Sequence, residues 1–182
     1  MGSFFLWNLR TEEQKSQEGL LRAILYQVLD SEPALAEDLL PKMWYEALQG
    51  DDVKLGLSSK GEMTQAFQEL GRLCTTTRKY CFFIGGIDEY SGNYMDGIAF
   101  INSQAANSNI KVVVSSRPIA PCEDAFAAKP MLLLQDLTRD DILAYIDETI
   151  GSHPYLTILE EESGSALQIK TEVADKSSGV FL

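Results

Sequence analysis

Apolar residues follow two kinds of spacing along the chain. Short segments rich in apolar or β-branched residues are typical of strands buried in a sheet, and they lie at 3–7, 79–87 and 110–114. Elsewhere apolar residues recur every three or four positions, as on one face of a helix. This spacing predicts helices from about 17 to 29, at 34–48, 63–73 and 95–106, and from about 138 to 151. Strands that alternate with helices predict an α/β domain with a mostly parallel sheet.

Individual residues predict where some of these elements begin and end. Pro41 should break the second helix or start a new turn there, because proline cannot continue the hydrogen-bond ladder of a helix. Thr138 is predicted to be the N-cap of the last core helix, with Asp140 and Asp141 in its first turn and Gly151 at its end. A loop and a pair of weaker helices are predicted at 49–60 and 154–177.

Composition narrows the class of protein. With 27 acidic and 15 basic residues the formal net charge is −12, and the scattered basic residues form no patch that would attract a nucleic-acid backbone. Three cysteines without CxxC spacing and one histidine, His153, supply no zinc-ligand set and fit a reducing compartment. No apolar run approaches the ~20 residues that cross a bilayer. We therefore expect a cytoplasmic chain that binds neither nucleic acid nor membranes, with Trp7 and Trp44 as core or helix-packing residues.

The most informative segment is the apolar run at 80–84, which ends in Gly85 and Gly86 followed by Asp88 and Glu89. Carboxylates at the carboxyl end of a parallel strand face the crevice in which α/β proteins bind nucleotides. There, one acid can hold Mg²⁺ and a neighbouring acid can orient the attacking water. An apolar run followed by Asp-Glu is also a common transition from a strand to a loop, and this alternative stays open.

A second apolar run ends in Ser115-Ser116-Arg117-Pro118. If both runs are strands of one parallel sheet, Arg117 lies at the same edge as Asp88 and Glu89. A guanidinium at that position can bind a terminal phosphate. The alternative is that Arg117 caps a loop or pairs with a surface acid.

Several segments in one order, spread over nearly the whole chain, resemble the nephrocystin-3-like or NACHT NTPase region of large fungal NLR-like proteins, which are P-loop NTPases of the STAND class. The matching segments are 3–8, 14–22, 25–27, 81–90, 114–118, 123–126 and 134–142. The resemblance implies a three-layer P-loop NTPase-like fold that binds ATP or GTP with Mg²⁺. It also implies that 82–89 is the Walker B strand with Asp88 and Glu89 as its catalytic acids, and that Arg117 is the sensor arginine.

The chain departs from the family pattern in two places. No GxxxxGK[ST] loop, the main phosphate-binding element, occurs in the 182 residues, so the first strand and the phosphate loop of the family are expected to be missing. Gly85 stands where the family has the Mg²⁺-binding aspartate, so no metal ligand is assigned. In the family the first strand is expected between the Walker B and sensor strands. Without it, these strands must pair directly or leave unpaired backbone groups, and we expect a marginally stable chain that is a truncated product or a segment of a longer protein.

The leading hypothesis is therefore a partial NACHT-type domain over 1–182, with the remaining α/β core at 3–134 and C-terminal helices at 135–182. It would be a fragment of a nucleotide-binding signalling switch with no hydrolytic activity of its own, and it would bind protein partners or self-associate. The alternative is a catalytically inactive protein-interaction scaffold of the same fold, with no cofactor. A third hypothesis is an unrelated soluble α/β binding domain.

Overall fold

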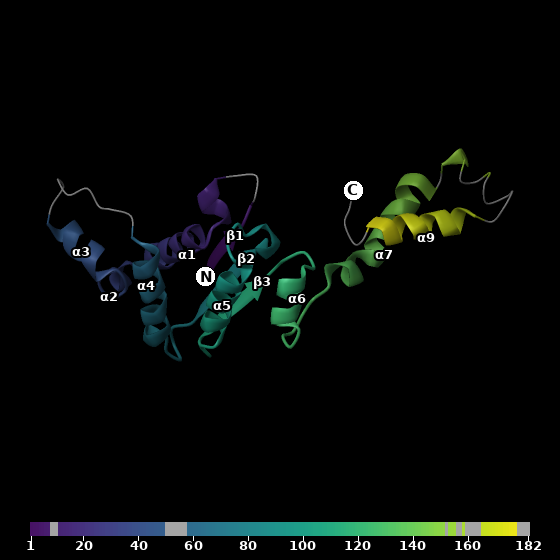
Figure 1. Ribbon diagram of the computed structural model, residues 1–182. Coiled ribbons are helices and arrows are strands. Elements are labelled where there is room, and N and C mark those ends of the chain that lie inside the picture. Colours follow the sequence, from purple (N-terminus) through teal and green to yellow (C-terminus); the bar gives the residue numbers. More distant parts are fainter. Residues whose placement is uncertain (8–10, 50–57, 152, 156–157, 159–164, 178–182) are drawn as a thin grey trace. The chain divides into compact units, whose positions relative to one another are not determined.

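The computed structural model describes residues 1–7, 11–49, 58–151, 153–155, 158 and 165–177 (Figure 1). The chain forms two compact units, Met1–Ala128 and Lys129–Leu182, each of which is described by itself. The division falls a few residues before the one at 134/135 that the sequence suggests.

The first unit is built on three parallel strands, β1 (Gly2–Phe5), β2 (Tyr80–Gly85) and β3 (Ile110–Val114), in the order β1-β2-β3 (Figure 1). The predicted α/β fold with a parallel sheet flanked by helices is confirmed. β2 and β3 pair directly, with Phe82 opposite Val112, so no strand lies between the two candidate site strands. Of the two arrangements expected from the sequence, direct pairing is the one observed.

Three long helices in the described part of this unit cover the same face of the sheet. They are α1 (Gln17–Ser31), α4 (Lys60–Leu73) and α5 (Tyr94–Ala105). Strand order follows sequence order, so right-handed crossovers place the intervening helices on one side. The Phe67 ring of α4 contacts Phe82 at 6.1 Å and the Phe100 ring of α5 at 5.1 Å between centroids. A β-carbon on Gly2 would lie 3.5 Å from Ile24 of α1.

The opposite face of the sheet is open among the described residues. Phe82 is 1% exposed, whereas the next residue, Phe83, is 37% exposed, because successive side chains of a strand point to opposite faces. Phe5 and Val113 share the face of Phe83 and are 65% and 49% exposed. We call Phe5, Phe83 and Val113 the open-face patch.

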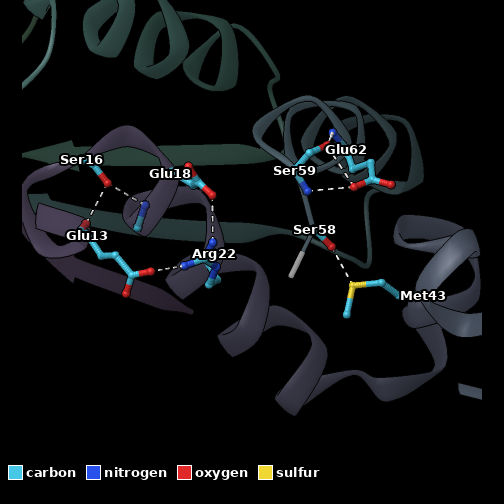
Figure 2. Close-up of polar contacts among 9 residues, drawn as sticks. Glu13, Ser16, Glu18, Arg22, Met43, Ser58, Ser59 and Glu62 are labelled. Carbon is cyan, nitrogen blue, oxygen red and sulfur yellow. Dashed lines mark hydrogen bonds and ion pairs between the residues drawn. The ribbon is translucent and has the colours of Figure 1, made fainter. Parts of the chain in front are cut away.

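Side chains fix the ends of the helices. The Ser16 hydroxyl accepts a hydrogen bond from the Gly19 amide at 3.1 Å at the start of α1, after a 3-10 turn, η1 (Glu12–Lys15). Figure 2 shows this cap, the Arg22 guanidinium between the Glu13 and Glu18 carboxylates at 2.7 and 2.9 Å, and the Ser59–Glu62 capping box of α4. The hydrogen bonds from Ser59 hold the pKa of Glu62 below its usual value. These caps satisfy amide groups that the first turn of a helix leaves without partners.

The helical stretch predicted at 34–48 is divided, as Pro41 predicted. It consists of a 3-10 turn, η2 (Pro33–Leu35), and two short helices, α2 (Ala36–Leu39) and α3 (Pro41–Leu48). Pro41 occupies the first turn of α3, where its missing N–H costs no hydrogen bond.

The two edges of the sheet differ. At the β1 edge, the Gln27 side chain of α1 accepts from the Ser3 amide at 2.9 Å and donates to the Ser3 carbonyl at 2.8 Å. At the other edge, the hydrogen bonds from the Tyr80 amide to the Asn109 carbonyl and from the Ser115 amide to Ile84 show that odd-numbered residues of β3 face β2. The backbone groups of Val112 therefore point away from the sheet. Gln27 blocks further strand pairing at one edge, whereas β3 is the outer strand at the other.

The second unit contains α7 (Leu134–Ile146), a π-helical turn, η4 (Asp147–Gly151), and α9 (Ala166–Ser177). Ion pairs join Arg139 to Asp175 at 2.5 Å and Lys170 to Asp147 at 2.6 Å. Buried apolar side chains lie in the same unit at Ile142, Ile146 and Ala174.

The predicted N-cap at Thr138 is wrong. α7 begins at Leu134, so Thr138 lies inside the helix, and its hydroxyl donates to the Leu134 carbonyl at 3.0 Å. Asp140 and Asp141 are accordingly beyond the first turn, whose acidic residue is Asp136. The apolar run at 131–134 leads directly into the helix, which is why the start lies earlier than the threonine suggests.

Some predictions lie outside the described residues, namely the loop at 50–57 and most of the first of the two weaker helices after 154. Among the helices that are described, none is long and apolar enough to span a membrane.

Candidate functional site

The candidate site lies where β2 and β3 end. After Gly85 the chain turns at Gly86, whose φ of 72° is the left-handed conformation that favours glycine. A β-carbon there would also lie 2.5 Å from the Leu6 carbonyl oxygen. The turn leads into a single 3-10 turn, η3 (Ile87–Glu89), which carries both acids of the motif.

A side chain at position 85 is excluded for a different reason than at Gly86. Strand register places Phe5 of β1 directly opposite it, and the Phe5 ring covers the glycine so closely that a β-carbon would lie 2.6 Å from the ring atom Cε1. The same β-carbon would lie 3.2 Å from the Ser115 hydroxyl. The space in which a side chain of residue 85 would extend is therefore taken by an aromatic ring from the neighbouring strand.

Asp88 and Arg117 meet, as expected for residues at the carboxyl ends of paired parallel strands. The Arg117 amide donates to Asp88 Oδ1 at 3.0 Å, and the Arg117 Nε atom lies 3.4 Å from Oδ2. The Ser116 hydroxyl adds a contact to Oδ1 at 3.5 Å, at the limit of a hydrogen bond. The Asp88 side chain is 10% exposed, whereas that of Arg117 is 80% exposed. The two residues join the ends of β2 and β3, while their predicted catalytic and phosphate-sensing roles stay predictions.

The loop that carries Arg117 is held at further points. The Ile87 amide donates to the Ser115 carbonyl at 3.2 Å, and the Tyr94 hydroxyl donates to the Asp88 carbonyl at 2.9 Å. After the loop, α6 (Ala120–Phe126) begins, and its Cys122 is buried against the core. Both sides of the Asp88–Arg117 contact are therefore anchored in the first unit.

Glu89 points to a different part of the site. It lines a cavity of about 520 Å³ together with Phe5, Leu6, Trp7, Gln14 and Gly86. Trp7 is 44% exposed and Trp44 of α3 is 38% exposed, so neither is a buried core residue. Trp7 and Gln14 were not foreseen as site residues, because their proximity depends on a backbone contact, from the Trp7 amide to the Gln14 carbonyl at 3.3 Å, that no sequence motif indicates.

The residues present do not fit the magnesium ion that the resemblance to NACHT-type NTPases implies. No group of three or more His, Cys, Asp or Glu side chains suited to a metal ion is found in the described part of the chain. Mg²⁺ requires carboxylate oxygens that can turn toward it at ~2.1 Å. Both Asp88 oxygens face nitrogen atoms of Arg117, and Gly85 offers no oxygen ligand from a side chain.

A second polar cluster lies at the opposite end of β2. The Tyr80 hydroxyl donates to Glu32 Oε1 at 2.9 Å, and Arg78 Nε lies 3.0 Å from Glu32 Oε2. Burial and then the hydrogen bond to Glu32 raise the pKa of Tyr80 above its ordinary value of 10.0. Burial also raises the pKa of the nearby Cys74 thiol. This cluster fastens the end of α1 to the start of β2.

His153, the single histidine, stacks on Tyr155 with ring centroids 5.4 Å apart. It belongs to the second unit and has no metal-binding group around it among the described residues.

Comparison with known proteins gives one result. The family model described as nephrocystin 3, N-terminal, matches residues 1–117, which is more than half of the chain and includes β1, β2, β3, Asp88 and Arg117. Searches of curated proteins and of solved structures returned no match. The matched segment ends at Arg117, the last residue of the pair that joins the two candidate strands. The chain belongs to the nephrocystin 3 N-terminal family.

Proposed function

We propose that the chain is the α/β part of a NACHT-type, STAND-class signalling switch, and that by itself it does not hydrolyse ATP or GTP. The observation that supports this proposal is the direct pairing of Asp88 with Arg117 at the carboxyl end of the sheet. It joins the residues that the family resemblance names as Walker B acid and sensor arginine. In this pairing both oxygens of the acid are engaged by Arg117.

The chain also lacks the groups that hold the phosphates. No GxxxxGK[ST] sequence occurs in its 182 residues, so neither the amide cradle nor the lysine of that loop is supplied. Phosphoryl transfer depends on positioning and on neutralising charge by such groups and by Mg²⁺. Without them the expected hydrolysis rate is that of the uncatalysed reaction.

Arg117 can still serve a recognition role. Its side chain is 80% exposed, and its contacts to Asp88 use the backbone amide and Nε. The terminal nitrogens of a guanidinium are well suited to a phosphate. Arg117 is thus the residue on which weak nucleotide binding by this chain would depend.

The experiment is a titration of the full chain with a fluorescent ATP analogue, with the Arg117→Ala variant as comparison and Arg78→Ala as the matched control. Binding that weakens in Arg117→Ala but not in Arg78→Ala supports a residual nucleotide site. Phosphate release above the uncatalysed rate, abolished by Asp88→Asn, would overturn the statement that the chain is inactive.

A second function, a protein-interaction scaffold, is favoured by the open-face patch. Parallel sheets in α/β domains are normally covered on both faces, whereas Phe5, Phe83 and Val113 are 37–65% exposed on one face of this sheet. Exposed apolar side chains that adjoin on one face mark contacts with other chains. The three cysteines are free, which agrees with action in the cytoplasm. Light scattering of the wild type and of Phe83→Ser tests self-association, which the variant should weaken if the patch is the contact.

A further inference from the structure

We infer that the carboxyl end of the sheet is a metal-independent clasp: Asp88 holds the backbone of the Arg117 loop, and Phe5 closes the place of the missing metal ligand at Gly85. The inference deepens the proposed function, on which its relevance to nucleotide rests, by stating that this site takes no divalent cation. Its test uses metal and stability measurements without nucleotide. If the chain fails to bind nucleotide, the inference is therefore still tested by the metal and stability data.

Arg117 contacts both carboxylate oxygens of Asp88. One carboxylate oxygen accepts the Arg117 amide at 3.0 Å, and the other lies 3.4 Å from Arg117 Nε. Asp88 can therefore turn toward a metal ion only by giving up its hydrogen bond to the Arg117 amide. The guanidinium beside the carboxylate would also repel a cation in that place.

The Asp88 side chain is also largely removed from solvent. The Asp88 side chain is 10% exposed, and ionised side chains so far out of water need close partners. The amide and the guanidinium of Arg117 supply them, with the Ser116 hydroxyl at 3.5 Å as a weaker contact. The carboxylate thus has a structural task that accounts for its position without a metal ion.

Phe5 and Gly85 form a cross-strand pair between β1 and β2. The two residues are opposite each other in the register of β1 and β2, and the ring lies over the glycine. An aromatic side chain across from a glycine fills the gap that the glycine leaves in the sheet surface. A side chain at residue 85 and the present position of Phe5 exclude each other, so Gly85 and Phe5 form a matched pair.

The remaining acid does not restore a metal site. Glu89 lines the cavity with Phe5 and Trp7, and the described residues hold no third acidic, histidine or cysteine ligand to complete a set. Mg²⁺ bound by one carboxylate alone would also need the phosphates of a nucleotide as ligands. In this chain even the first carboxylate is engaged by Arg117.

Two measurements on the full chain test the clasp. The first follows free Mn²⁺ by electron paramagnetic resonance as protein is added to millimolar Mn²⁺, with EDTA as the positive control for binding. The inference expects the same free Mn²⁺ signal for the wild type and for Asp88→Asn. A loss of free Mn²⁺ in the wild type that Asp88→Asn abolishes would overturn it.

The second measurement is a double-mutant cycle read as thermal midpoints. Gly85→Ala should lower the Tm by about 3 °C or more when Phe5 is present, and by less in the Phe5→Ala background, because the ring is what the new methyl group meets. Phe83→Ala is the matched control, since Phe83 is an exposed aromatic residue of the same face that does not cover Gly85. Its effect should add to that of Gly85→Ala. Equal effects of Gly85→Ala with and without the Phe5 ring would contradict the pairing.

Discussion

The two ends of β2 carry similar residues in different arrangements. At its start, Arg78 pairs with Glu32, and the two side chains are 39% and 36% exposed. Beyond its end, Arg117 pairs with Asp88, but the acid is 10% exposed and the arginine 80%. In the first pair both side chains are partly exposed, and the pair links the end of α1 to the start of β2. In the second pair a buried acid holds an exposed guanidinium, which leaves a cation presented to solvent at the carboxyl edge of the sheet.

The two pairs are expected to differ in role: the residues at the start of β2 stabilise the fold, whereas Arg117 is available to bind an anion. Loss of side chains at the start of β2 should reduce stability without altering the binding of an anion. Loss of Arg117 should do the reverse, because an exposed ion pair contributes little to folding. The following variants test this contrast, in order of expected effect.

The largest effect is expected for Tyr80→Ala. Tyr80 is 5% exposed and stacks on Phe82 with ring centroids 6.1 Å apart. Removal of a buried aromatic ring costs ~3–5 kcal/mol. Urea unfolding should show this loss, whereas Tyr26→Ala, at a residue 69% exposed, should change the free energy of unfolding by less than about 0.5 kcal/mol. Similar losses in both variants would show that the start of β2 is not a packed part of the core.

A smaller loss is expected for Asp88→Ala. The variant leaves the Arg117 amide without its acceptor at 3.0 Å, and a hydrogen bond at this exposed position contributes about 0.5–1.5 kcal/mol. Asp88→Asn is the matched control, because its amide oxygen can still accept that hydrogen bond. Chemical unfolding should therefore rank the wild type above Asp88→Asn and Asp88→Asn above Asp88→Ala. An alanine variant as stable as the asparagine variant would contradict the clasp.

Part of this picture could be predicted from the sequence. The three strands are short segments rich in apolar residues, and the parallel order of such strands brings Asp88 and Arg117 to one edge. The short elements, η3 and α6, were not predicted, because three and seven residues are too few to show a helical period. The pairing of Phe5 with Gly85 depends on strand register, which no local pattern encodes.

The site was predicted less completely than the fold. The motif gave the two acids and the arginine, whereas the partner of Arg117 is Asp88, whose side chain is only 10% exposed, and not a surface acid. The cavity residues Trp7 and Gln14 were missed, because tryptophan next to an apolar run normally indicates core packing. The exposure of Trp7 and its place with Glu89 in the lining of one cavity follow from the folded structure and from no sequence motif.

A pH-dependent effect of about 1 kcal/mol is expected for Tyr80→Phe. The folded chain raises the pKa of Tyr80 above its ordinary value of 10.0, so the stability that the phenol contributes is complete below pH 10 and is lost as the pH rises through the raised value. Tyr80→Phe loses the hydrogen bond to Glu32, about 0.5–1.5 kcal/mol at neutral pH, but has no phenol to titrate. Unfolding free energies measured from about pH 8 to about pH 11 should therefore converge. A constant gap across that range would show that the phenol is not shielded.

The smallest effect on stability is expected for Arg117→Ala, below about 1 kcal/mol, because its side chain is 80% exposed. Its effect on any binding of an ATP analogue should be about tenfold or more, the range of a charge-assisted hydrogen bond. Arg78→Ala should leave such binding unchanged. If Arg78→Ala weakened binding as much as Arg117→Ala, overall charge rather than a site would be responsible.

The most direct test of the clasp is the hydrogen exchange rate of the Arg117 amide, measured by NMR with EDTA and again with excess Mg²⁺. The account predicts slow exchange at the same rate in both solutions, because this amide donates to Asp88 at 3.0 Å and no metal ion competes for the carboxylate. Faster exchange of this amide on addition of Mg²⁺ would show that Asp88 leaves Arg117 for a metal ion, and would contradict the account.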